Sequence, residues 1–512
     1  MGLCAQLLPR LPHEKGSCMR NVYLPLAGTP GQEPFGRVAP LLRGALLIGA
    51  CGGFLFATIL TIAAALYPNY GAWWEALAQA HGHLQLYGWA GLFVLGVALH
   101  FLPRLRGAPL ALPQLVPWIL GLQVASLILR GVSQPFAATS SSGFWHFGLL
   151  TSGILECVAM GFVLTCGVLT FLHGPPLSER PAMLKVIPLV ALAFASLGLA
   201  SLVNFGNMIA VAHTSLGIIG ESGDNLNVTL GLCGFLVPIA LAMSTQALPM
   251  YAGLKSFSRR TIWSLAAVYL VGLILYLVGI ASSDTSPLGS NICTGLGWLG
   301  LGGALLAFVI AFIRMIRSRG KIPAQMARLS PTPEQMAHTY QTQIATQRAT
   351  FGPFVACIAS AYMWASLAAV LLLIDGIALL TNGTILVAVD AIRHSLTIGF
   401  ITLLLCGIAP RMITAFSGGK LVSPRLVTAT LWLGNSAALL RVSSVVFQPL
   451  LGATSFIDRL LFGLSGPLGL TVAICLVINL WPALPLTKRS ELGAEWKPNR
   501  TNVPQKHPSL ST

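Results

Sequence analysis

The chain has 512 residues, of which 55% are hydrophobic and only 9% are charged. A soluble core of this size needs far less apolar surface, so the composition excludes a soluble globular protein and indicates a polytopic membrane protein. The formal net charge is +16, but the basic residues form no stripe interleaved with aromatic residues. A lipid bilayer, and no nucleic acid, is therefore the predicted partner.

Twelve apolar runs along the chain are about twenty residues long or longer, which is the length that crosses a bilayer as a helix. They cover residues 41–66, 80–103, 111–131, 145–172, 184–206, 226–250, 261–282, 293–316, 352–380, 392–412, 425–447 and 459–482. The predicted fold class is an all-α polytopic membrane protein with about twelve transmembrane helices.

Connecting segments that are rich in Lys and Arg alternate with segments that hold almost none. The segment before the first span and those after spans two, four, six, eight, ten and twelve are basic, while the intervening loops hold almost no basic residues. Basic loops remain on the cytoplasmic side of a membrane. Both termini are therefore predicted to be cytoplasmic, and the intervening loops face the outside.

The polar insert between spans eight and nine divides the chain unequally. The predicted organisation is a cytoplasmic N-terminal tail over 1–40, transmembrane helices 1–8 over 41–316 and a cytoplasmic loop over 317–351. Transmembrane helices 9–12 follow over 352–483, and a cytoplasmic C-terminal tail covers 484–512. A short surface helix is expected after Pro333, and no soluble domain of useful size is present.

Five histidines come from separate parts of the sequence but share one predicted depth, the outer membrane face. They are His81, His83, His146, His213 and His394. A histidine in a membrane segment is a candidate functional residue, and imidazole is the commonest metal ligand. His81, His83 and His394 are the main candidate ligands, and depth alone adds His146 and His213. The other five histidines are predicted to be ordinary surface or interface residues.

The spacing of the first two histidines limits how they bind. Residues two apart on a helix point about 200° from each other, so His81 and His83 are not expected to face one metal unless the helix begins between them. Tyr87 follows His83 by one turn and is a candidate for orienting its ring.

Charged side chains accompany these histidines. Glu156 lies ten residues deeper than His146 on its span, and a carboxylate at that depth is a functional candidate or a buried interhelical hydrogen-bond partner. Arg393 and Arg441 are predicted at the outer level, where they would hold haem propionates or simply extend to the interface.

Three stretches resemble one family. "HGHLQLYGWAGLFVLGVALHFLPRLRG", "GFLVPIALAMSTQALPMYAGL" and "RHSLTIGFITLLLCGIAPRMITAFSGG" are similar to the second span, the sixth span and a later span of the NnrS family, and the resemblance covers roughly residues 40–480. Gly82 and Leu84 depart from the alanine and glutamate that the family has there.

The resemblance implies a multi-pass protein of the bacterial cytoplasmic (inner) membrane that contains haem and copper. It implies a role in the response to nitric oxide and relief of nitrosative stress, without catalytic turnover of nitric oxide as the main activity. The family's histidine motifs correspond to His81, His83 and His394 here, so these residues are expected to bind the cofactors near the outer face.

Two other functions stay open at this stage. A divergent relative of haem-copper oxidase subunit I would also carry an HxH stretch, but the sequence has no adjacent His-His pair and only one HxH. A secondary transporter without metal would also have twelve spans and an intramembrane glutamate. Bound haem would separate these functions, because a carrier would be colourless.

Overall fold

The computed structural model describes residues 35–67, 69–214, 216–252, 256–317, 332–452 and 455–485, and every regular element within these ranges is a helix. Residues 1–34 and 486–512 of the predicted tails and residues 318–331 of the predicted loop lie outside the described residues. The helices longer than three residues, in chain order, are α1 (Ala39–Ile48), η2 (Gly49–Phe54), α2 (Leu55–Leu66), α3 (Ala72–His83), η3 (Leu84–Leu92), α4 (Phe93–Arg106), α5 (Val116–Ala137), α6 (Gly143–Leu172), α7 (Pro181–Thr214), α8 (Glu221–Thr229), η6 (Leu230–Leu236), α9 (Val237–Ala252), α10 (Arg259–Ala281), α11 (Pro287–Arg317), α13 (Pro333–Phe351), α14 (Phe354–Asn382), α15 (Val389–His394), η7 (Ser395–Thr402), α16 (Leu403–Ser417), α17 (Pro424–Leu451) and α18 (Phe456–Leu480).

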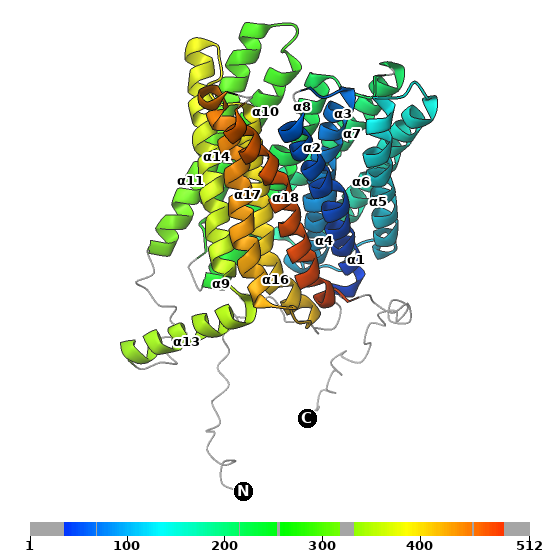
Figure 1. The fold of residues 1–512 in the computed structure, drawn as a ribbon. Helices are drawn as coiled ribbons and strands as arrows, with labels where there is room; N and C mark the ends of the chain where they lie inside the picture. Colours follow the sequence, from blue (N-terminus) through cyan, green and yellow to red (C-terminus); the bar gives the residue numbers. More distant parts are fainter. Residues whose placement is uncertain are drawn as a thin grey trace, which may run out of the picture.

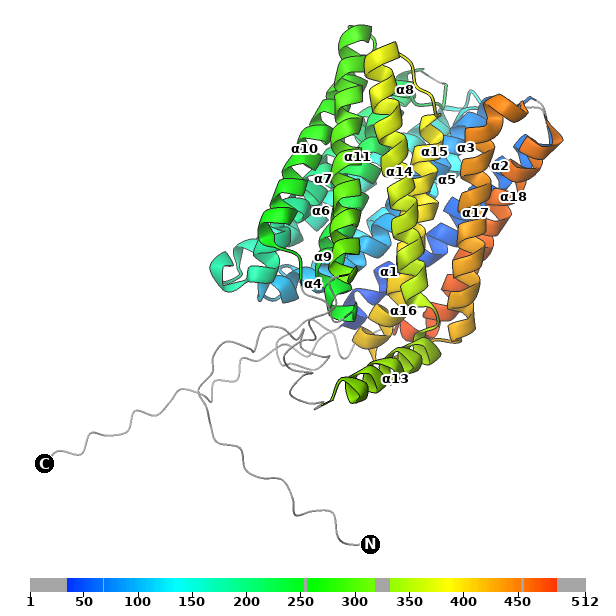
Figure 2. The same ribbon diagram turned by 90° about the vertical axis from the view of Figure 1, so that its left-hand side faces the viewer.

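These elements form twelve helices that are long and apolar enough to cross a membrane, which confirms the predicted fold class. Span two (Ala72–Arg106), span six (Glu221–Pro249) and span ten (Val389–Ser417) have 94%, 72% and 78% of their central residues buried, whereas the other nine have 33–50%. Three helices therefore form the centre of the bundle, and nine helices cover them (Figures 1 and 2). A helix that is apolar all round is buried in this way, while a lipid-facing helix buries only one side.

The three central spans share an uncommon backbone feature. Each contains a π-helical segment, η3, η6 or η7, and a fourth, η2, lies in span one. The segments pack against one another, η2 on η3, η3 on η6 and η6 on η7. Because π-helical segments occur frequently at functional sites, their meeting in the bundle centre directs attention to spans one, two, six and ten.

Several spans begin earlier than the apolar runs predict. Span two begins at Ala72, eight residues before the expected start, because Trp73, Trp74 and Glu75 belong to the helix although they interrupt the apolar run. Tryptophans are favoured at the membrane interface. His81 and His83 are consequently in the third turn of the helix and not in its first.

The first and last described segments meet at one end of the bundle, where the Arg43 guanidinium of α1 lies 4.6 Å from the centroid of the Trp481 ring, directly after α18. Phe35 lies 5.1 Å from the His100 ring and 5.8 Å from the Phe416 ring, measured between ring centroids, at the ends of spans two and ten. His100, which the sequence predicts to be a surface or interface residue, is only 2% exposed, because this aromatic cluster covers it. We call this end, where the basic segments lie, the basic end, and the other the outer end.

The expected helix after Pro333 is present as α13, which lies across the basic end (Figure 1). Gly352 joins it to α14 with a φ of +68°, and a Cβ there would lie 2.5 Å from the Pro424 carbonyl oxygen. Only glycine fits a left-handed turn against another backbone in this way.

Small residues bring α18 close to α2. A Cβ added to Gly466 would lie 2.2 Å from Thr61 Oγ1 and 2.7 Å from the Ala57 carbonyl oxygen. Small residues allow this approach in membranes, where helix association depends on close packing.

We expect Gly466→Ala to destabilise the protein by about 1–3 kcal/mol, because the added methyl group overpacks the α2–α18 contact. Gly161→Ala is the matched control, since nothing lies within 4 Å of a Cβ there. Unfolding in detergent measures both variants. Equal stability of the two would contradict the packing role of Gly466.

Candidate functional site

The outer halves of spans two and ten carry His81 and His394 on parallel helices. Trp89 Nε1 donates to Thr402 Oγ1 at 3.3 Å, and these residues follow the two histidines by eight positions each. Each histidine therefore lies roughly 12 Å or less above this bond along its helix axis. The two helices bring His81 and His394 to one level of the outer half of the bundle.

Both histidines have the same ring nitrogen engaged. His81 Nδ1 donates to the Gly53 carbonyl oxygen of η2 at 2.8 Å. His394 Nδ1 donates to the Asp390 carbonyl oxygen at 2.9 Å, and Asp390 Oδ1 lies 3.1 Å away. A hydrogen bond at Nδ1 fixes the tautomer with its lone pair on Nε2, which is the arrangement of a metal-ligating histidine.

Charged groups surround this pair. Arg441 Nη2 lies 2.7 Å from Asp390 Oδ2, and its guanidinium stacks 4.2 Å from the Phe462 ring centroid. His394, Asp390 and Arg441 all lie within electrostatic range of His81. Asp390 thus holds His394 with one oxygen and Arg441 with the other.

Arg393 points elsewhere. Its Nη2 donates to Asn225 Oδ1 of α8 at 2.7 Å, so it connects span ten to span six at the outer end. Of the two arginines predicted near the site, Arg441 lies beside His394 through Asp390, and Arg393 is engaged with another helix.

His83 lies on the other side of span two. Its Nε2 donates to Glu156 Oε2 of α6 at 2.7 Å, and both side chains are buried. Asn204 Nδ2 of α7 donates to the same oxygen at 3.1 Å. The His83 ring also lies 4.7 Å from the Tyr87 ring, and the Tyr87 hydroxyl donates to the Asn227 carbonyl oxygen at 3.0 Å.

The sequence interpretation missed the rest of this network. Arg130 of α5 is 1% exposed; its guanidinium donates to Asn204 Oδ1 at 3.3 Å and to Gln134 Oε1 at 2.5 Å. Gln134 Nε2 then donates to Gln79 Oε1 at 2.8 Å. Arg130 was recognisable as an arginine at the outer end of a span, where the charge alternation predicts none.

The remaining two predicted histidines lie apart from these groups. His146, near the start of α6, is 7% exposed, and its Nδ1 donates to the Ser142 carbonyl oxygen at 3.3 Å. His213, in the last turn of α7, is exposed. The structure therefore groups His81 with His394 and His83 with Glu156, and it leaves His146 and His213 outside both groups.

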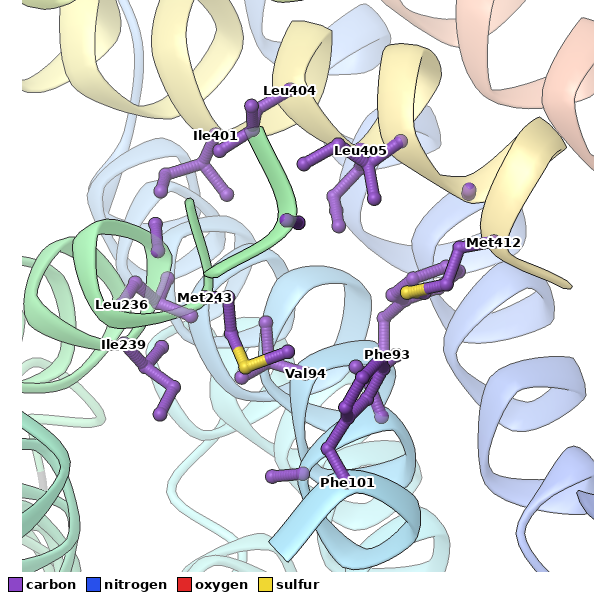
Figure 3. Close-up of a pocket in the computed structure, with 16 residues that line it drawn as sticks. Phe93, Val94, Phe101, Leu236, Ile239, Met243, Ile401, Leu404, Leu405 and Met412 are labelled. Atoms are coloured by element: carbon purple, nitrogen blue, oxygen red, sulfur yellow. The ribbon is translucent and has the colours of Figure 1, made fainter. Parts of the chain in front are cut away.

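An apolar pocket begins just below the Trp89–Thr402 bond, toward the basic end. Its cavity volume is about 70 Å³, and all sixteen lining residues are apolar. Figure 3 shows Phe93, Met243 and Met412 converging on it from α4, α9 and α16. The central spans thus carry a polar site in their outer half and an apolar space beneath it.

The described residues offer ligands for haem iron but no ligand cluster for a copper ion. Haem iron needs axial ligands only, and His81 and His394 each present a free Nε2. Copper without haem needs a cluster of side chains, and within the described ranges no group of three or more His, Cys, Asp or Glu residues is arranged to hold a metal ion. The two imidazoles are therefore donors of the kind that holds haem iron, and no protein-only copper site is found in the described part of the chain.

We expect Arg130 and Glu156 to be energetically coupled through Asn204. Removing either charge alone, by Arg130→Leu or Glu156→Leu, leaves the other uncompensated and is expected to cost about 3–5 kcal/mol. The double variant should be less destabilised than the sum of the single variants by about 1–3 kcal/mol. Detergent unfolding of the four proteins measures this, and additive losses would contradict the coupling.

Three comparisons with known proteins bear on this chain. Among solved structures, a heme-copper terminal oxidase, determined as a dimer by cryo-EM, matches with a TM-score of 0.60 and 11% identity over 89% of this chain and 84% of that chain. At this identity the match shows a shared fold alone. No curated protein matches.

The family comparison is more specific. A family model described as NnrS protein matches residues 131–485, which is more than two thirds of the chain. The match contains His394, Glu156 and Arg441, and it begins after the stretch with His81 and His83. On this match, the chain belongs to the NnrS family.

Proposed function

We propose that this protein is a haem-binding membrane protein of the nitric oxide response, with a site in the outer half of the bundle and a location in the bacterial cytoplasmic membrane. The observation that carries the proposal is the pair His81 and His394, each held at Nδ1 by a backbone carbonyl oxygen on parallel helices. The family membership and the oxidase-like fold support it.

His81 and His394 would hold the haem iron through their imidazoles, and Arg441 would neutralise a propionate by charge-assisted hydrogen bonding. A haem bound there would supply one-electron chemistry, and it would take a diatomic gas at the position that one of the two imidazoles vacates. The chain's own contribution is orientation: Gly53 and Asp390 fix the rings, and the Trp89–Thr402 bond fixes the helices that carry them. Copper remains an expectation from the family resemblance.

The apolar pocket supports nitric oxide as the ligand. Nitric oxide is a small apolar gas that partitions into lipid, and the lining offers it no competing polar group. A gas that entered this pocket would lie against the same helices that carry His81 and His394.

The transporter alternative gains no support. In the described ranges spans two, six and ten are continuous helices, with π-helical segments in place of unwound breaks, whereas carriers commonly bind substrate at discontinuous helices. A full oxidase centre would need a histidine cluster beside the haem, which the described residues do not provide.

We expect purified wild-type protein to show a haem Soret band, and His81→Ala and His394→Ala each to lose it or shift it, because each removes one axial imidazole. His146→Ala is the control and should keep the wild-type spectrum. Optical absorbance with iron and copper analysis measures this. Wild-type protein without haem, or unchanged spectra in both histidine variants, would refute the proposed site.

We expect Ala240→Phe to slow nitric oxide binding to the reduced protein, because the new ring occupies the pocket. Ala195→Phe, on the exposed side of α7, is the control of equal bulk. Stopped-flow absorbance measures the association rate. Equal rates in the two variants would show that the gas does not use the pocket.

A further inference from the structure

Span two has two polar edges that face opposite ways. On one edge, Gln79, His83 and Tyr87, four residues apart, bond to α5, α6 and α8 respectively. On the other edge, His81 bonds to η2 and Trp89 bonds to η7. Hydrogen bonds on both edges fix the rotation of this helix about its own axis.

Glu156 is the central acceptor of the first edge. It is 0% exposed, and its Oε2 accepts from His83 of span two and Asn204 of α7. Asn204 in turn accepts from Arg130 of α5. One carboxylate oxygen therefore connects span two to a scaffold of three surrounding helices.

The second edge depends on the first through helix geometry. Residues two apart point about 200° from each other, so the rotation that directs His83 at Glu156 also directs His81 at Gly53 and span ten. If the acceptor at position 156 were lost, His83 would leave a buried donor unsatisfied, which costs about 1–3 kcal/mol. Turning span two to rehydrate or re-pair this donor would move His81 away from His394.

We propose that Glu156 is a positioning residue that, by accepting from His83, sets the rotation of span two and so holds His81 in place opposite His394. This inference rests on the proposed haem site. It assigns His83 the role of an anchor for the helix and leaves ligation to His81.

Glu156 has a second potential role, which the test must separate. As a carboxylate it offsets the buried charge of Arg130, and Glu156→Gln removes this charge while keeping an amide oxygen that accepts from His83. A positioning role predicts that Gln substitutes for Glu and Leu does not. A role in charge compensation predicts that both variants change alike.

The experiment compares Glu156→Leu and Glu156→Gln in purified full-length protein. Glu156→Leu should lower haem retention about tenfold, as expected for partners that orient a ligand, and should alter the low-spin electron paramagnetic resonance signal. Added imidazole should restore that signal by taking the place of His81. Glu156→Gln should keep the wild-type signal.

Gln123→Leu provides the matched control. Gln123 is fully buried on α5, and neither of its side-chain polar atoms has a hydrogen-bond partner among the described residues. Its replacement by Leu changes a buried polar group outside the network and should leave the signal unchanged.

A folding defect is separated by replacing the partners of Glu156 as well. His83→Leu with Glu156→Leu removes the unsatisfied donor, and Arg130→Leu added to them removes the uncompensated charge. Exchanging a whole buried charged group for apolar side chains is often neutral for stability, and positioning predicts that this triple variant still has the altered signal. A wild-type signal in Glu156→Leu or in the triple variant, or equal changes in Glu156→Leu and Glu156→Gln, would overturn the inference. Absence of haem from wild-type protein would instead refute the proposed function.

Discussion

Hydrogen bonds on opposite edges of span two are the constraint on which the site depends. The core of a bilayer offers no water, so a buried polar side chain is costly unless it bonds to another part of the protein. Span two meets this requirement with Glu156 on one side and with Gly53 and Thr402 on the other. A helix held on both edges cannot rotate freely, and this restriction gives His81 a defined direction in an otherwise apolar bundle.

The number of spans could be predicted from sequence because apolar length identifies each crossing. The side on which each loop lies stays a prediction from the basic residues. The ends of the helices were harder to predict, because Trp73, Trp74 and Glu75 interrupt the apolar run but belong to the helix. The sequence also did not predict which spans lie at the centre of the bundle, because apolar composition does not distinguish contact with lipid from contact with another helix. Burial of spans two, six and ten emerges only from packing.

The site could be predicted only in part. The spacing of His81 and His83 indicated that they point apart, and their hydrogen bonds to different helices agree with this. The predicted depth of Glu156 was wrong relative to His83, because the two side chains lie 2.7 Å apart and so at one level. A single sequence does not show which side chains of separate helices bond to each other, so the His83–Glu156 hydrogen bond was not predicted. Depth alone also grouped His146 and His213 with the others, but the direction of a side chain around its helix matters as much as its depth.

The pairing of His83 with Glu156 changes what the HxH stretch means in this chain. An imidazole that already donates to a buried carboxylate is costly to withdraw, since the carboxylate would lose one of two hydrogen bonds in a medium without water. His81, by contrast, gives up nothing at Nε2 when it ligates. One histidine of the motif is therefore suited to anchoring and the other to ligation. The division follows from the 200° between them, because a helix face directed at the scaffold cannot also face span ten.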